Sequence, residues 1–172
     1  MAVGERAKAS RAICQAVRGL PAFQKAHAVF VFVGMPGEPD TDALIDEALA
    51  AGKRVCVPRC GVKPRMDAVP ILSRADLRPG TLGIPEPPAD APAAAPEEID
   101  LALIPCLSAG RDGSRLGHGA GYYDAYLAGR RMQKICLCFE ALVRDSVPMT
   151  PLDIWMDAVI TEKGIDTREG TI

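Results

Sequence analysis

The sequence predicts an α/β protein, a single three-layer domain with a mostly parallel central sheet and helices on both faces. One observation is a set of apolar runs such as HAVFVFVGM (27–35), which are too continuously apolar for a half-exposed strand and indicate burial on both faces. The other is a helix-like stretch between two such runs, because strand–helix–strand order is typical of parallel pairing with a crossover helix.

The first half of the chain contains the most regular patterns. In chain order we expect a helix at 5–20, a strand at 27–35, a helix at 42–52, a strand at 54–58 and a short strand at 66–72. The helix at 42–52 has the clearest ends. Asp40 or Thr41 can cap its first turn, and Gly52 can end it in a left-handed conformation.

The second half is less regular until residue 99. Residues 85–98, PEPPADAPAAAPEE, offer little to bury and predict an extended surface connection within the domain rather than a linker between domains. After it we expect a strand at 99–105, a glycine-rich loop, a helix at about 122–131, a strand at 134–139 and a last strand at 157–162.

Composition excludes some classes of function. The chain has 172 residues, 48% of them apolar and 24% charged, which is ordinary for a globular protein with a sizeable core. A formal net charge of -2 argues against general binding of nucleic acid or a membrane surface. No long apolar run or signal-peptide core is present, so we expect a cytoplasmic protein. Its six cysteines lie mostly in apolar segments, which predicts buried, reduced thiols.

The segment RDGSRLGHGAGYYDAYL (111–127) is the main candidate for a functional site. Its glycines allow successive backbone N–H groups to converge on a phosphate, and the following helix N-terminus favours an anion. Arg115 could bind phosphate oxygens, and Asp124 could hold a metal ion. The residues alone leave a plainer alternative open, because tight turns also use glycine and Asp124 could complement the helix dipole.

This segment, with PCLSAG before it, resembles the signature of the 5-formyltetrahydrofolate cyclo-ligase family. Three other segments resemble that family in the same order along the chain: GEPDTDALIDEALAAGKRVCVP, TLGIPEP and VPMTPLDIWMDAVITE. The resemblance spans about residues 5–162. It implies ATP-dependent ring closure of 5-formyltetrahydrofolate to 5,10-methenyltetrahydrofolate, with release of ADP and phosphate and with Mg²⁺ as the metal. We also expect the protein to be a monomer.

The resemblance also implies roles for individual residues. For ATP binding they are Arg6, Lys8 and Arg11 on the first helix and Arg115, Leu116, Gly117, His118, Gly119, Ala120, Gly121, Tyr122 and Tyr123 on the loop. For the reduced folate they are Val33, Glu38, Met66 and Tyr123. Arg115 and Tyr123 are the implied catalytic residues, and Asp124 and Asp153 the implied magnesium ligands.

Several positions depart from the family pattern. Ala109 and Gly110 stand where an aromatic residue and a carboxylate are usual, although Asp112 is close by. Further departures include Ala120, Leu142 and Leu152. Their number near the folate side predicts an altered pocket for the pterin or its aryl group. They leave an alternative function open, in which a catalytically weakened relative serves as a nucleotide- or folate-binding module, or acts on a different small substrate.

Overall fold

A seven-stranded mixed sheet forms the centre of the structure, a computed structural model that describes residues 1–168. Across the sheet the strands are β12 (Gly164–Thr167), β11 (Ala158–Thr161), β9 (Gln133–Leu137), β6 (Leu101–Ile104), β1 (Ala28–Val31), β2 (Arg54–Cys60) and β3 (Met66–Ile71). The inner neighbours pair in parallel, and only the two outermost pairs described are antiparallel. The predicted mostly parallel sheet is confirmed.

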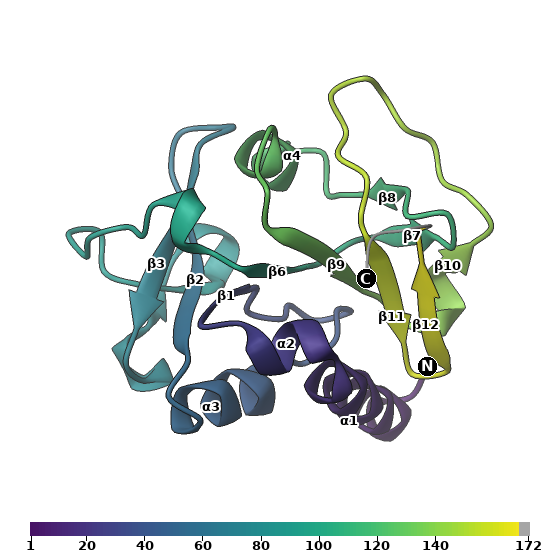
Figure 1. Ribbon diagram of the computed structural model, residues 1–172, viewed down its shortest axis with the longest axis horizontal. Coiled ribbons are helices and arrows are strands. Elements are labelled where there is room, and N and C mark those ends of the chain that lie inside the picture. Colours follow the sequence, from purple (N-terminus) through teal and green to yellow (C-terminus); the bar gives the residue numbers. More distant parts are fainter. Residues whose placement is uncertain (169–172) are drawn as a thin grey trace.

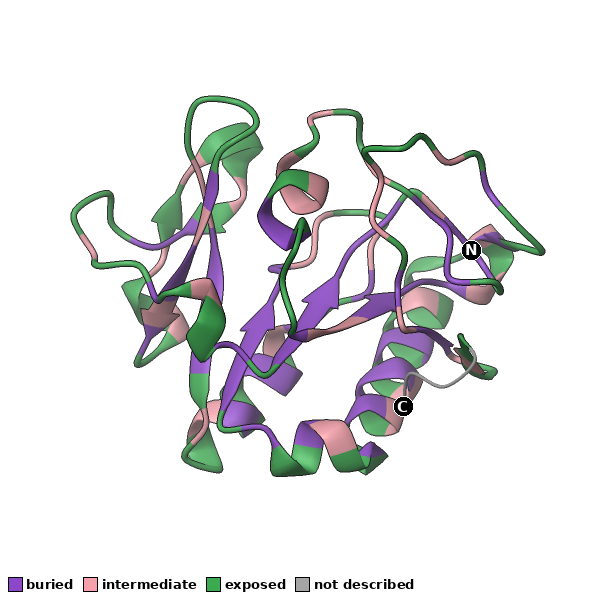
Figure 2. Cartoon of the chain, turned by 45° about the horizontal axis from the view of Figure 1, so that its top comes forward, coloured by how far each residue is buried: buried purple, intermediate pink, exposed green. Residues whose placement is uncertain are grey.

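Helices cover the two faces of this sheet unequally (Figure 1). One face carries α1 (Val3–Gly19), α2 (Pro21–Lys25) and α3 (Asp42–Ala50), whereas the other carries the short α4 (Tyr122–Leu127). Separate clusters of buried side chains fill the space on each side. The inner strands are therefore buried on both faces, which Figure 2 shows as a continuous buried interior.

The turn between β1 and α3 is fixed by the side chains of Asp40 and Thr41, the two residues predicted to cap α3. Thr41 is the N-cap residue, but its hydroxyl donates to the carbonyl of Phe32 (2.6 Å) instead of capping its own helix. The Asp40 carboxylate accepts from the N–H of Asp42 (2.9 Å), so it satisfies a free donor of the first turn. Gly52 has a φ of +81°, as expected for a glycine that ends a helix.

Several elements differ from the sequence-based prediction. The helix expected at 122–131 ends at Leu127, because Ala128 has a ψ of 122° and Gly129 a φ of +71°. The strand expected at 157–162 is not the last one, since β12 follows it and pairs antiparallel at the edge. The residues of β12 are half-buried or exposed, so the strand has no apolar run by which it could be recognised.

The expected glycine-rich loop begins as a small sheet rather than as an open loop. Strand β7 (Ser108–Gly110) lies between β10 (Val143–Arg144), with which it pairs in parallel, and β8 (Arg115–Leu116), with which it is antiparallel. A second small pair joins β4 (Arg78–Pro79) to β5 (Pro85–Glu86). Single turns of 3₁₀ helix occur at η1 (Arg74–Asp76), η2 (Thr81–Gly83), η3 (Pro96–Glu98) and η4 (Glu140–Leu142).

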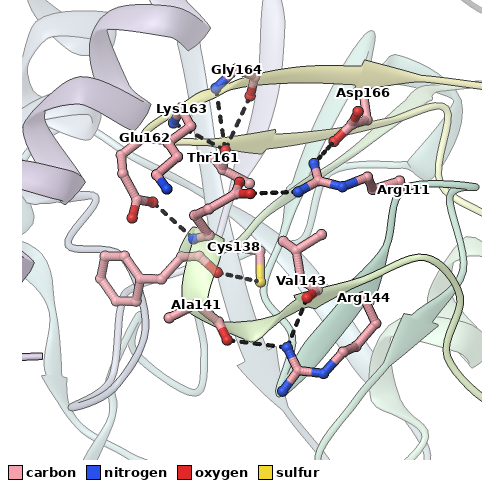
Figure 3. Close-up of polar contacts among 12 residues, drawn as sticks. Arg111, Cys138, Ala141, Val143, Arg144, Thr161, Glu162, Lys163, Gly164 and Asp166 are labelled. Atoms are coloured by element: carbon pink, nitrogen blue, oxygen red, sulfur yellow. Dashed lines mark hydrogen bonds and ion pairs between the residues drawn. The ribbon is translucent and has the colours of Figure 1, made fainter.

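Arg111, in the turn between β7 and β8, ties this small sheet to the edge of the large one (Figure 3). Its guanidinium contacts the carboxylate of Glu140 in η4 and that of Asp166 in β12 (2.6 Å for the latter). The N–H of Glu140 in turn donates to Glu162 (2.9 Å). Because these groups are partly exposed, the network orients the turn more than it stabilises the fold.

The cysteines are free and mostly buried, as their apolar segments predict. All six cysteines are free, and all but the half-buried Cys60 are buried. Burial raises the pKa of the Cys14 and Cys56 thiols to about 11, so they stay protonated at neutral pH. Within residues 1–168, no helix is both long and apolar enough to cross a membrane.

Gly110, one of the departures from the family pattern, lies where a side chain has no room. A Cβ on Gly110 would lie 2.2 Å from the Ser114 hydroxyl and 2.4 Å from an oxygen of Asp112. The same Asp112 oxygen accepts from the N–H and the hydroxyl of Ser114 (3.0 and 2.5 Å). The carboxylate of Asp112 thus occupies the space beside Gly110, two positions after the usual carboxylate.

We predict that Gly110→Ala lowers the free energy of unfolding by roughly 1–3 kcal/mol, since the added methyl group must displace the Asp112–Ser114 pair and the nearby backbone of Ser146. Gly164→Ala is the matched control, because a Cβ there would meet no atom within 4 Å. Denaturant unfolding of both variants checks the prediction. Equal stability of the two variants would contradict it.

Candidate functional site

A cavity of about 470 Å³ opens beyond the carboxyl ends of β1 and β6, the place where open α/β sheets bind ligands. Its lining residues come from segments that are far apart in the sequence. They are Phe32, Val33, Met35, Glu38, Pro58, Cys60, Thr81, Leu82, Ile84, Glu86, Pro105, residues 115–124, Pro148, Met149, Thr150 and Asp153.

The glycine-rich loop forms one wall of this cavity, and all of residues 115–124 line it. Gly119 and Gly121 have φ values of +86° and +74°, a region that other residues rarely adopt. Gly117 is needed for a different reason, because a Cβ there would lie 3.0 Å from the guanidinium of Arg115. The glycines therefore bring the loop backbone close to the cavity and to Arg115.

Arg115 is buried, with 5% of its surface exposed, and holds the loop in place. One of its terminal nitrogens donates to the carbonyl of Pro105 at the end of β6 (3.0 Å), and the other to the carboxylate of Asp124 in α4 (3.0 Å). Its Nε is buried without a hydrogen-bond partner in the described structure. Arg115 thus joins β6, β8 and α4, and two of its nitrogens already have protein partners.

Asp124 and Asp153, the residues expected to bind magnesium, both line the cavity. Asp124 contacts Arg115 through one oxygen and accepts the N–H of Ile154 through the other (3.0 Å). Asp153 accepts the N–H of Thr150 (2.6 Å). The described residues contain no group of three or more His, Cys, Asp or Glu side chains placed to hold a metal ion by themselves.

Glu38 also lines the cavity and contacts the glycine-rich loop directly. One of its carboxylate oxygens is 3.0 Å from Nε2 of His118, and the other accepts the N–H of Met35 (2.9 Å). The side chain of Glu38 is only 6% exposed, whereas that of His118 is 46% exposed. The structure therefore brings the residue expected to bind the folate against the loop expected to bind ATP.

Tyr123 lies between these groups. Burial raises the pKa of its phenol strongly, and the negative charge of Glu38 raises it further, so the hydroxyl remains protonated and can donate a hydrogen bond. Its ring lies 5.8 Å from the Arg115 guanidinium and 6.2 Å from the ring of Phe30. Val33, also expected at the folate site, is a further lining residue.

Four of the expected site residues do not line the cavity. Arg6, Lys8 and Arg11 lie on α1, half-buried or exposed, and Met66 packs in the core on β3. The helix α1 nevertheless approaches the site, because the Ser10 hydroxyl accepts the N–H of Asp40 in the turn that carries Glu38 (3.0 Å). The roles of these four residues stay predictions.

The departures from the family pattern mostly lie away from the cavity, since only Ala120 lines it. Ala109, in β7, is completely buried, and Leu152 is 83% exposed. Leu142 packs against the same core as Ala109. The cavity wall is therefore altered at one of these five positions.

Glu86 is the most distinctive lining residue for which the sequence alone predicts no role. It lies in β5, is 8% exposed and belongs to the segment TLGIPEP. The resemblance of this segment to a family element could have pointed to Glu86. A carboxylate between two prolines, however, is typical of a surface turn. The apolar wall of Leu82, Ile84, Pro148 and Met149 comes from irregular segments with no periodic pattern.

Comparison with known proteins finds relatives in sequence and in fold. A curated 5-formyltetrahydrofolate cyclo-ligase from Mycolicibacterium smegmatis is 38% identical over 146 residues, which cover 78% of this chain and 73% of the relative. A probable 5-formyltetrahydrofolate cyclo-ligase from Schizosaccharomyces pombe is 31% identical, with 91% and 85% covered. The NMR structure of Aquifex aeolicus 5,10-methenyltetrahydrofolate synthetase superposes with a TM-score of 0.87 at 28% identity, covering 98% of this chain and 86% of that one.

The model of one protein family, described as the 5-formyltetrahydrofolate cyclo-ligase family, matches residues 1–162. That match includes every segment that lines the cavity. The chain belongs to the 5-formyltetrahydrofolate cyclo-ligase family.

Proposed function

We propose that this protein catalyses the ATP-dependent ring closure of 5-formyltetrahydrofolate to 5,10-methenyltetrahydrofolate, with release of ADP and phosphate. The observation that carries the proposal is that the glycine-rich loop and Glu38 face the same cavity and touch through His118. Phosphoryl transfer to a formyl group needs both substrates in one enclosed site, because the reacting atoms must be held close together.

On the nucleotide side, the backbone of residues 117–121 provides N–H groups for phosphate oxygens. Arg115 neutralises part of the phosphate charge from within the wall and fixes Asp124. Since two of its nitrogens already have protein partners, we assign it a positioning role as well as an electrostatic one. Arg6, Lys8 and Arg11 would approach the nucleotide from α1.

The charge of the cavity supports ATP that is bound together with a cation. Glu38, Glu86, Asp124 and Asp153 line the cavity, against Arg115 and His118. An unneutralised polyphosphate would be repelled by this excess of carboxylates. Asp124 and Asp153 fit Mg²⁺, which favours oxygen ligands and is commonly held by one or two carboxylates together with substrate phosphates. When bound, Mg²⁺ supplies charge neutralisation at the transferring phosphoryl group.

On the folate side, the Glu38 carboxylate can accept paired hydrogen bonds from the amino and ring N–H groups of the pterin. Its burial strengthens such bonds, because little water competes for the oxygens. Val33, Tyr123 and the apolar wall around Leu82 and Ile84 supply contacts for the rings. The protonated Tyr123 hydroxyl can orient the formyl oxygen that accepts the phosphoryl group.

The alternative, a non-catalytic binding module or an enzyme for another small substrate, rests on the departures from the family pattern. Only Ala120 among them lines the cavity, which favours the catalytic proposal. A monomeric protein, confined to the cytoplasm and without nucleic-acid or membrane partners, stays a prediction.

Purified protein with Mg²⁺, ATP and 5-formyltetrahydrofolate is expected to form the methenyl product and ADP in equal amounts. Absorbance of the methenyl group and a separate ADP assay check this. A protein from the same family, assayed alongside, is the positive control. If the control turns over and this protein forms neither product, the binding-module alternative is favoured.

Replacing Arg115 should affect stability as well as nucleotide binding. Arg115→Ala is expected to lower the free energy of unfolding by about 3 kcal/mol, because it leaves the partly buried Asp124 carboxylate without its cation. Arg130→Ala, which removes an exposed pair with Glu97, is the matched control and should cost at most about 1 kcal/mol. Denaturant unfolding measures both. Equal losses of unfolding free energy in the two variants would show that the buried pair stabilises the protein no more than the exposed pair does.

Glu38 and His118 should couple the two halves of the site. Glu38→Ala is expected to weaken binding of the folate at least about tenfold, since it removes a charged acceptor. It should also weaken ATP binding by a few-fold, through loss of the loop contact, and His118→Ala should show only this smaller effect. Calorimetric titration with each ligand tests this, with His27→Ala as control. Unchanged ATP binding in both variants would show that Glu38 and His118 do not couple the two halves of the site.

A further inference from the structure

Ring closure creates a proton that must leave the reacting nitrogen. The attacking N10 of the folate is a secondary amine, and in the cyclised methenyl product this nitrogen carries no hydrogen. A group that accepts this proton in the transition state speeds such a step, provided that it lies in the cavity and is not already engaged. This inference rests on the proposed function, because it concerns the same reaction.

Glu86 is a buried carboxylate with unused capacity. One oxygen accepts a long hydrogen bond from the N–H of Cys60 (3.3 Å), and the Cys60 thiol is a further, weak donor to the carboxylate. Among residues 1–168, no lysine, arginine or histidine lies within ion-pair distance of it. A buried carboxylate without a cation is costly to keep, which makes it a candidate for a functional role.

The position of Glu86 is fixed by its surroundings. Strand β5 pairs with β4 through Pro79 and Pro85 and through Arg78 and Glu86. The carboxylate packs onto Gly80, where a Cβ would lie 2.6 Å from the carboxyl carbon of Glu86. It therefore stays in the cavity wall beside Leu82 and Ile84, apolar residues suited to the aryl ring that N10 carries.

The other acidic groups in the cavity already have strong partners. Asp124 is paired with Arg115, and Asp153 accepts the N–H of Thr150. Glu38 is engaged by His118 and by the N–H of Met35. Cys60 is not an acceptor, because burial and then the charge of Glu86 raise the pKa of its thiol to about 11. Glu86 is thus the cavity carboxylate with neither a cation nor a short hydrogen bond among the described residues.

We propose that Glu86 is a further catalytic residue, which accepts the proton that N10 loses during ring closure. The N10 lone pair forms the new bond to the formyl carbon, and the N10–H proton passes to the Glu86 carboxylate. The bond between that carbon and the phosphorylated oxygen then breaks, and phosphate leaves with the electron pair. The positive charge is shared by N5 and N10 in the product, and Glu86 returns its proton to solvent.

Glu86→Gln tests this role, since the amide keeps the shape of the side chain but cannot take the proton. Methenyl formation is followed optically in a stopped-flow instrument, and ADP is measured in samples quenched with denaturant and chelator. We expect a first-turnover burst of ADP and roughly a hundredfold slower methenyl formation, with KM values no higher than those of the wild type because the phosphorylated intermediate accumulates. Glu86→Asp should recover part of the rate.

Glu97→Gln is the control, since Glu97 is exposed and does not line the cavity. Equal slowing of ADP and methenyl formation within the first turnover of Glu86→Gln would overturn the proposal, as would an unchanged rate. The same split in His118→Ala rather than in Glu86→Gln would transfer the role to the histidine. Thermal unfolding and calorimetric folate binding show whether Glu86→Gln is folded and loaded. An inactive wild-type protein would refute the proposed function itself. Failure of the proposed function is therefore distinguished from failure of the role proposed for Glu86.

Discussion

The buried guanidinium of Arg115 is the contact on which the rest of the site depends. It links the carbonyl of Pro105 at the end of β6 to the carboxylate of Asp124 in α4, while its own backbone lies in β8. Asp124 extends the link to the segment after residue 148 through the N–H of Ile154. The Arg115 guanidinium therefore fixes the end of β6, the two-residue β8 and the six-residue α4 relative to one another. A side chain at position 117 would crowd this guanidinium.

Glu38 and His118 close the cavity from the other side. The turn that carries Glu38 is anchored below by Thr41, whose hydroxyl reaches the backbone of Phe32, and by Ser10 of α1. The glycine-rich loop is thus held at Arg115 and touched at His118. The residues can be divided by their chemistry into a nucleotide half and a folate half of the cavity. The two halves are nevertheless in contact, because Glu38 lies against His118.

Much of the fold could be predicted from the sequence, because apolar periodicity reports burial. The strands around Val29, Val55 and Leu103 and the helix around Leu44 follow from it directly. The glycine-rich segment also indicated a binding site from the sequence alone. Periodicity could not show that Arg115 belongs to a strand, since β7, β8 and β10 are two or three residues long. Nor could it show that Glu86 faces the cavity, because such a placement depends on the packing of two short strands around Gly80.

The unequal covering of the two faces of the sheet has a consequence for local stability. The face beneath the sheet is closed by α1, α2 and α3, whereas the cavity face is built from the six-residue α4, short strands and irregular segments. Segments with few ladder hydrogen bonds and much exposed backbone unfold locally at a lower free energy than the core does. We therefore expect backbone amides on the cavity face to exchange with solvent through small openings that leave the large sheet intact. Local changes on the cavity face need not disturb the helical face, because the two sides of the sheet have separate clusters of buried side chains.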